Sequence, residues 1–421
     1  MNKCSVYVSN MESKYEGQYD LREGYLEVMI FGYCGDVDEY TPIVSEVAYK
    51  NIYIADLLNR KFMFSARFHR VGAKNGLTQY QKYKTDFYLA TEKENDFEAF
   101  FHDINIKGVI LYNSVLNDLY YNPSIVISEN EKEIVYRKIL NPDKKTIEIN
   151  KNNIDCVEFG GTCNSISKND NRNITIESEN RAKIKLNQPI KCEEVLKYIN
   201  EFDVIMNSYC LLGIHSYTTY IITTDNKCFD VKHKLLCKDK YCEKVLYQPV
   251  KVNFFEYVEK MYKTLDYRTT ANRNKYVPFG FISPTTLEDQ FVFYFRCIDL
   301  YMGEYLEKET GKYPSNYDRL STFVDENIDL FSYDDKVNIE NLKKELNSLR
   351  NQYVHEGYYL CDNKFAVTEK KEKLYYKELD YGWLLKMVKI FKYGVYKILY
   401  TKILTCEIDE AELKNALKCW V

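Results

Sequence analysis

The sequence predicts an α+β protein in which a β-rich N-terminal domain (residues 1–248) precedes an all-α helical bundle (residues 249–421). In the first half, short runs of β-branched and aromatic residues alternate with Gly, Asn, Asp and Pro, which is typical of antiparallel strands. From Val252 onward, apolar residues recur every three or four positions, which indicates helices. At 421 residues, the chain is long enough for two or three domains with cores of their own.

The composition narrows the class of protein. Hydrophobic residues make up 45% of the chain and charged residues 29%, as in a soluble globular protein. The net charge of -4 argues against a broad basic surface, so nucleic-acid binding would need a local patch. The 13 cysteines show no regular framework, and the apolar runs are too short for a secretory signal or a membrane span. We therefore expect reduced thiols, a cytoplasmic location and no membrane insertion.

The strands of the first domain are expected in a mostly antiparallel sheet or sandwich. The runs that predict them are residues 24–31, 62–68, 85–89, 107–112 and 124–127. Residues 174–176 and 183–186 predict a hairpin, and Pro189 is expected to open a helix. The apolar stripe of that helix, which is typical of a buried face, comprises Val195, Ile199, Phe202, Met206 and Tyr209.

Thiols and an imidazole gather near the end of this domain, at Cys228, His233, Cys237 and Cys242. Such groups can bind zinc tetrahedrally, and the protein would then be a zinc-dependent regulator. Their spacings lack the short pairs that are typical of zinc knuckles. Residues 220–229 are more simply a β-hairpin with a polar turn, so we expect no metal site.

The second domain is expected to hold four or five antiparallel helices. One begins at a capping box of Thr285 and Glu288, and its seam comprises Phe291, Phe295, Ile298, Met302 and Tyr305. The later helices are expected at residues 315–331, 334–357, 372–404 and 407–420. Before them, a polar loop carries Arg268, Arg273 and Lys275, which are either solvated loop charges or contacts to an RNA backbone.

One stretch, residues 349–357, combines a cation, an amide and a titratable imidazole. Asn351 and His355 are four residues apart and share a helix face, and Arg350 beside them can reach the same place. Arg can bind a phosphate in a fork, His can move a proton near pH 7, and Asn can hold the geometry. This combination suits a phosphodiester and needs neither a metal nor a cofactor.

The segment Arg350-Asn351-Gln352-Tyr353-Val354-His355 resembles the Arg-Asn-x-x-x-His signature of HEPN domains, and its flanks resemble the ApeA-like branch of that superfamily. Residues 287–301 are similar to the first HEPN helix, with Asp299 where an acidic residue is usual and supports the site. Residues 174–206 are similar to the end of the accompanying N-terminal domain. The resemblance implies a homodimer paired through the motif helices, with Arg350, Asn351 and His355 as catalytic residues.

The resemblance also implies an activity and a setting. The activity is metal-independent endoribonuclease cleavage, in which a ribose 2'-hydroxyl attacks the adjacent phosphate and leaves a 2',3'-cyclic phosphate. The setting is antiphage defence or abortive infection in the bacterial cytoplasm, with transfer RNA (tRNA) a leading substrate and an unknown phage trigger. The N-terminal domain would then sense infection, restrain the nuclease or select the RNA. The alternative is a non-catalytic HEPN module that binds RNA or nucleotides, or that pairs a toxin with its antitoxin.

Overall fold

The computed structural model describes residues 1–8, 14–22, 25–31, 49–56, 58, 60–74, 78–91, 103–113, 115–119, 125–129, 134–138, 144–167, 174–211, 217–233, 249–264, 286–331, 337–355, 364–369 and 372–418. The side chains of residues 49–50, 66–74, 78–79, 118, 125–129, 134–138, 162–167, 174–179 and 355 are not among those described.

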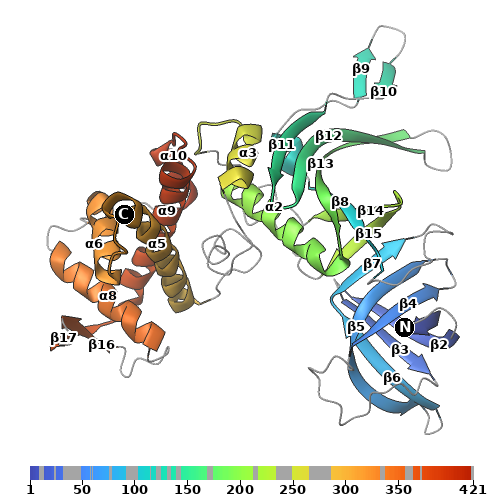
Figure 1. The fold of residues 1–421 in the computed structure, drawn as a ribbon, viewed down its shortest axis with the longest axis horizontal. Coiled ribbons are helices and arrows are strands. Elements are labelled where there is room, and N and C mark those ends of the chain that lie inside the picture. The colour runs from blue at the N-terminus through green and yellow to red at the C-terminus, as the bar shows by residue number, and fades with distance from the viewer. Residues whose placement is uncertain are drawn as a thin grey trace. The chain divides into compact units, whose positions relative to one another are not determined.

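The chain divides into two compact units. The first comprises residues 1–200 and 214–243, and the second comprises residues 201–213 and 244–421. The first unit carries a large antiparallel sheet and the second carries most of the helices, which confirms the predicted α+β class (Figure 1). We expected the domain boundary after residue 248. The second unit instead resumes at residue 244 and also includes the C-terminal part of helix α2 (Val195–Cys210).

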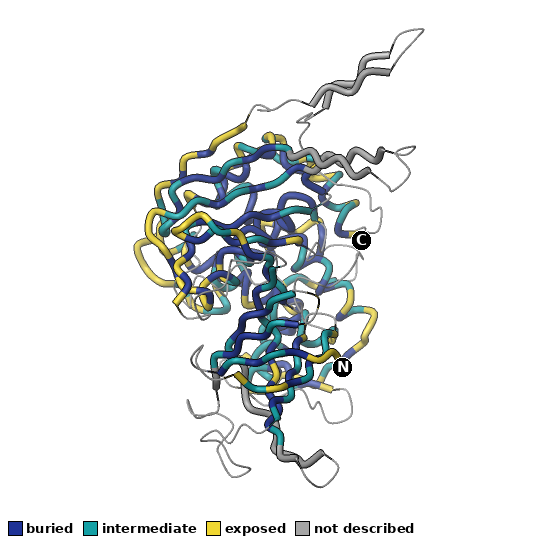
Figure 2. The backbone as a smooth tube through the Cα atoms, turned by 90° about the vertical axis from the view of Figure 1, so that its right-hand side faces the viewer, coloured by how far each residue is buried: buried dark blue, intermediate teal, exposed yellow. Residues whose placement is uncertain are grey.

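Six strands of the first unit form a closed antiparallel ring. The order around it is β1, β2, β3, β6, β5 and β4, and the pairing of β4 with β1 closes it. Buried and partly exposed positions alternate along β1, β2 and β3, as in a sheet with one face toward a core (Figure 2). The strands are β1 (Asn2–Val8), β2 (Lys14–Arg22), β3 (Tyr25–Phe31), β4 (Tyr49–Asp56), β5 (Lys61–Lys74) and β6 (Thr78–Thr85).

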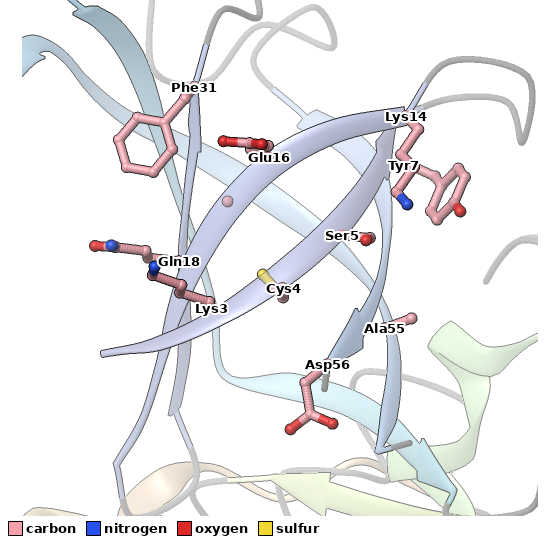
Figure 3. Close-up of a pocket in the computed structure, with 11 residues that line it drawn as sticks. Lys3, Cys4, Ser5, Tyr7, Lys14, Glu16, Gln18, Phe31, Ala55 and Asp56 are labelled. Atoms are coloured by element: carbon pink, nitrogen blue, oxygen red, sulfur yellow. The ribbon is translucent and has the colours of Figure 1, made fainter. Parts of the chain in front are cut away.

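Apolar side chains fill the inside of the ring, among them Val6, Tyr19, Val28, Ile54 and Phe64. The packing is tight at Gly17, where an added Cβ would lie 2.4 Å from Cγ2 of Val6 and 2.8 Å from the carbonyl oxygen of Met29. A pocket of about 740 Å3 lies on β1, β2 and β4, with Cys4 and Asp56 among its lining residues (Figure 3).

The sheet continues from β5 into seven more antiparallel strands. The N-terminal part of β5 pairs with β7 and its C-terminal part with β6, so β5 belongs both to the ring and to the rest of the sheet. From β7 the order is β15, β14, β8, β13, β12 and β11. The bounds are β7 (Phe87–Thr91), β8 (Ile106–Tyr112), β11 (Lys145–Lys151), β12 (Ile154–Ser167), β13 (Ile174–Ile190), β14 (Thr218–Thr223) and β15 (Cys228–His233). Short helix α1 (Val115–Leu119) and a separate hairpin of β9 (Ile125–Glu129) and β10 (Ile134–Lys138) lie between them in the chain.

Residues 174–190 form one strand, and the hairpin predicted there is wrong. β13 pairs with β12 from Ile174 through Leu186 without a turn. Residues 177–181 are polar, but they contain neither Gly nor Pro and continue the extended pairing. Pro189 lies within this strand, one residue before its end, rather than opening a helix. The helical segment begins after it with η2 (Cys192–Glu194) and α2 (Val195–Cys210). The predicted stripe of α2 is buried, and pairing of β14 with β15 confirms the hairpin predicted at 220–229.

The helices of the second unit follow the predicted order. Its elements after α2 are α3 (Phe254–Thr264), α5 (Leu287–Thr310), α6 (Asn316–Glu326), α7 (Ile328–Phe331), α8 (Ile339–His355), β16 (Lys364–Glu369), β17 (Glu372–Glu378), α9 (Tyr381–Ile398), the π-helical turn η5 (Leu399–Ile403) and α10 (Glu410–Ala416). Thr286 rather than Thr285 caps α5, because its hydroxyl accepts a hydrogen bond from the backbone N–H of Asp289.

Aromatic side chains form the core between α5, α6 and α9. The ring of Phe391 lies 5.5 Å from that of Phe291 and 5.8 Å from that of Phe323. Gly394 lies inside α9 without interrupting it. It lets Phe323 approach closely, since an added Cβ would lie 2.3 Å from that ring.

Residues 372–378 are a strand, so the prediction of one helix over 372–404 is wrong in its first turns. β17 pairs with β16 in an antiparallel hairpin that lies against α8. The reason is non-local: Tyr375 and Lys377 contact Glu345 of α8, which favours extended chain here. Helix α9 begins only at Tyr381, where Asp380 caps it. Within the described ranges, no helix combines the length and the apolarity needed to cross a bilayer.

Candidate functional site

Helix α8 positions the Arg350-Asn351 pair. The Asn338 side chain accepts a hydrogen bond of 3.0 Å from the backbone N–H of Asn341 and so caps the first turn. The sequence predicts an apolar stripe of Ile339, Leu342, Leu346, Leu349 and Tyr353 on this helix; the last four are buried and Ile339 is partly exposed. Arg350 follows this stripe at its edge, with a side chain that is only 13% exposed.

Three contacts hold the guanidinium of Arg350. Its Nη1 donates a hydrogen bond of 2.9 Å to Oδ1 of Asn351. Its Nη2 lies 4.0 Å from Oδ2 of Asp299 on α5, and its Cζ lies 5.9 Å from the centre of the Phe295 ring. Burial lowers the pKa of Arg350, although an arginine keeps its charge at neutral pH. The site therefore contains a largely buried cation whose carboxylate partner lies at the limit of an ion pair.

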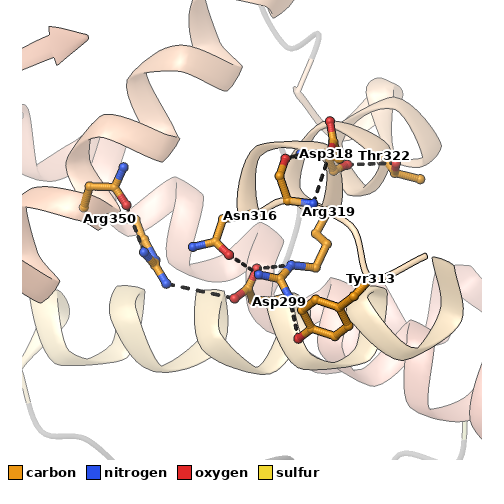
Figure 4. A network of polar contacts seen from close by, with 9 residues as sticks. Asp299, Tyr313, Asn316, Asp318, Arg319, Thr322 and Arg350 are labelled. Carbon is orange, nitrogen blue, oxygen red and sulfur yellow. Dashed lines mark hydrogen bonds and ion pairs between the residues drawn. The ribbon is translucent and has the colours of Figure 1, made fainter. Parts of the chain in front are cut away.

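A different arginine binds Asp299 more closely. Arg319 on α6 places Nε 2.8 Å from Oδ1 of Asp299, but the N–H is not aligned for a hydrogen bond, so the contact is an ion pair. The other guanidinium nitrogens donate to the hydroxyl of Tyr313 and to Oδ1 of Asn316 (Figure 4). These bonds direct Arg319 toward Asp299.

Gly303 provides the space that Arg319 occupies. It lies one helical turn after Asp299 on α5. An added Cβ would lie 3.2 Å from Nη1 of Arg319 and 3.3 Å from its Cδ. Arg319 is consequently only 5% exposed, which is rare for arginine unless it has a charged partner.

Positive charge exceeds negative charge in this group, which we call the arginine cluster: Arg296, Asp299, Arg319 and Arg350. Burial raises the pKa of Asp299, and Arg319 and Arg350 oppose that rise. Arg296 is exposed on α5, close enough to Arg350 to affect its pKa. Nε of Arg350 is buried and has no hydrogen-bond partner among the described residues. Three cations around one carboxylate can attract a phosphate, and Arg350 has a donor to offer it.

The structure brings three of the predicted site residues together: Arg350, Asn351 and Asp299. His355 is the last residue of α8, four positions after Asn351 and so about one turn further along, and its side chain lies outside the described residues. Arg268, Arg273, Lys275 and Gly357 also lie outside them. Tyr353 packs in the core, 6.0 Å from the ring of Phe291.

Cys228 and His233 do not form the pair that a zinc site would need. They are five residues apart on β15, and side chains alternate between the two faces of a strand, so they point to opposite sides of the sheet. Cys228 is exposed, whereas His233 is buried with its ring 6.0 Å from that of Phe87. Cys237 and Cys242 lie outside the described residues.

Sequence reasoning missed two members of the cluster, Arg296 and Arg319, and the sequence contained a signal for Arg319. The predicted helix at 315–331 turns Leu320 and Phe323 inward, and Arg319 precedes one by a single residue and the other by four. That spacing puts Arg319 at the buried face. A cation on a buried face needs a carboxylate partner, and this was the signal available in the sequence.

No family model, no curated protein and no solved structure matches this chain.

Proposed function

We propose that this protein is a metal-independent endoribonuclease of the ApeA-like HEPN type, with its chemistry at Arg350, Asn351 and His355. The observation that carries the proposal is the state of Arg350. It is largely buried and held by Asn351, and Arg319 rather than Arg350 is the close partner of Asp299. Arg350 therefore keeps a buried N–H to offer a phosphate in a locally positive site.

Each residue has a distinct role in this reaction. Arg350 stabilises the charge that develops on the phosphoryl oxygens, and His355 moves the proton of the attacking 2'-hydroxyl or of the leaving oxygen. Asn351 holds the guanidinium of Arg350 in its orientation. Asp299 is a positioning residue, because it draws Nη2 of Arg350 toward α5 without neutralising it at close range.

The reaction needs a general base and a general acid, and one protomer supplies a single His355. A homodimer paired through α8 would bring two His355 and two Arg350 to one cleft, so that each histidine takes one of the two roles. The chain is proposed to act in bacterial antiphage defence on cellular RNA, with tRNA the first substrate to test. The first unit would sense the phage trigger, restrain the nuclease or select the RNA.

The test is cleavage of total cellular RNA by the purified full-length chain in EDTA. We expect products that end in 2',3'-cyclic phosphate, and no cleavage of DNA, because DNA lacks the attacking hydroxyl. Arg350→Ala and His355→Ala should each slow cleavage by about 100-fold or more. Lys344→Ala is the matched control, since Lys344 lies on the same helix in an ion pair with Glu369.

Other outcomes would point elsewhere. Cleavage that persists in folded His355→Ala protein would move the chemistry to another site. Tight RNA binding without cleavage, in the presence of infected-cell extract as well as in its absence, would favour the non-catalytic module.

A further inference from the structure

A second site lies in the first unit, in a pocket of about 650 Å3 that we call the Asp230 pocket. Part of its lining is a row of cross-strand neighbours on β14, β15, β7 and β5: Tyr220, Asp230, Ala90 and Phe62. Residues directly opposite one another in antiparallel strands point to the same face, so these four side chains share one face of the sheet. Lys232 and Tyr88 form the adjacent row. Ala90 is the smallest of the six, which leaves a hollow beside Asp230.

The two carboxylate oxygens of Asp230 differ, because Oδ2 is in an ion pair and Oδ1 has no hydrogen-bond partner among the described residues. Lys232 places Nζ 2.6 Å from Oδ2. Oδ1 is buried and has no hydrogen-bond partner within the described part of the chain. Burial raises the pKa of Asp230, against the opposing effect of Lys232. A buried carboxylate oxygen without a donor costs free energy, so this position suits a ligand that supplies an N–H.

Two cations border the same pocket. The side chain of Lys232 is 38% exposed and that of Arg60 is 33% exposed. Arg60 is fixed, because its Nε donates to Asp56 over 2.8 Å and its Nη2 donates to the hydroxyl of Tyr19 over 3.0 Å. A cation that is already fixed can bind an anion at a smaller loss of side-chain entropy.

We propose that the Asp230 pocket binds a mononucleotide. Oδ1 of Asp230 accepts an N–H of the base, Tyr220 supplies aromatic surface for it, and Lys232 and Arg60 bind the phosphate. The volume lies in the usual range for pockets that hold small molecules, about 300–1,000 Å3. This proposal stands independently of the ribonuclease activity.

The pocket on β1, β2 and β4 has a different character (Figure 3). Both carboxylate oxygens of its Asp56 accept hydrogen bonds from the protein. Burial, helped by the charge of Asp56, raises the pKa of Cys4 to about 12, so the thiol stays protonated. Its buried carboxylate therefore has both oxygens bonded and its buried thiol stays protonated, whereas Asp230 has a buried oxygen without a donor among the described residues, so we assign the ligand to the Asp230 pocket.

The test is isothermal titration of the full-length chain with AMP, GMP, CMP and UMP, and with inorganic phosphate. We expect at least one nucleotide to bind with a Kd below about 1 mM. Asp230→Asn should weaken that nucleotide at least tenfold without lowering the melting temperature, because it removes a buried charge that lacks a full set of partners. Asp225→Asn is the matched control, since Asp225 also pairs with the lysine two residues later but is exposed on the hairpin turn.

Three results would overturn the proposal. The first is no binding by any of the four nucleotides. The second is binding of phosphate as tight as that of the nucleotides, which would mean a simple anion patch. The third is a large fall in the melting temperature of Asp230→Asn, which would mean that Asp230 is a structural carboxylate.

Discussion

Each unit of the protein buries an aspartate beside an arginine, and the two carboxylates differ in how fully they are bonded. Asp56 in the ring accepts hydrogen bonds from the hydroxyl of Tyr19, the backbone N–H groups of Leu58 and Arg60, and Nε of Arg60. Asp299 in the arginine cluster has two arginines near it, but its Oδ1 has no aligned donor among the described residues.

The pKa shifts of the two groups have opposite signs for this reason. Burial alone would raise the pKa of Asp56, but the hydrogen bonds from Tyr19, Arg60 and Leu58 outweigh it and lower that pKa. Burial raises the pKa of Asp299, and the two arginines do not fully oppose it. A saturated carboxylate stabilises a fold, whereas an unsaturated one costs stability and is expected where a site serves a ligand.

The largest expected loss of stability follows from removing the fully bonded carboxylate, Asp56. Asp56→Ala should lower the free energy of unfolding by about 3–5 kcal/mol, because it leaves Arg60 and the hydroxyl of Tyr19 without their buried partner. The measurement is urea unfolding. Asp20→Ala is the control, since its partner Arg22 is 78% exposed and such surface pairs contribute about 0–1 kcal/mol. Equal effects of the two substitutions would refute the distinction.

The next prediction tests whether looser packing of the second unit explains why Asp299 is less fully bonded than Asp56. Gly17→Ala in the ring and Gly394→Ala in α9 should each destabilise by about 1–3 kcal/mol, because the new Cβ would overlap Val6 in one case and Phe323 in the other. Thermal unfolding measures both. A large loss at Gly17 with none at Gly394 would mean that the second unit is loosely packed, and Asp299 would then need no functional explanation.

The pH dependence of stability separates the two carboxylates by sign. The lowered pKa of Asp56 gives stability that is present above about pH 4 and is lost as the pH falls through the folded-state value. The raised pKa of Asp299 does the opposite, since stability decreases as the pH rises from about 4 through its folded-state value. Urea unfolding of the wild type, Asp56→Asn and Asp299→Asn between pH 3 and 7 gives both slopes. Slopes of the same sign would contradict this account.

The smallest expected change in stability is that of Asp299→Asn, at about 1 kcal/mol, because the amide oxygen can still face Arg319, which also keeps its bonds to Tyr313 and Asn316. If Asp299 positions Arg350, the same variant should cut RNA about tenfold more slowly. Cleavage assays and unfolding are run on one preparation. Destabilisation as large as that of Asp56→Ala would make Asp299 a structural residue.

The local features of this protein follow from the sequence alone. The α+β class, the buried stripes of α2 and α8, the hairpin of β14 and β15 and the neighbourhood of Arg350 and Asn351 all depend on residues within a few positions of each other. Side-chain periodicity determines these features, because the chain repeats every two residues in a strand and every 3.6 in a helix.

Tertiary structure decided the rest, because those features join residues that are distant in sequence. The closure of the ring by β4 on β1, the role of β5 in two parts of the sheet and the extension of β13 through polar residues depend on strand partners that no local pattern specifies. The pairing of Asp299 with Arg319, and the row that places Asp230 beside Ala90, arise in the same way. The sequence by itself placed Arg350 and Asn351 together on one helix, and only the packing of helices and strands determined which buried charges have hydrogen-bond partners among the described residues and which do not.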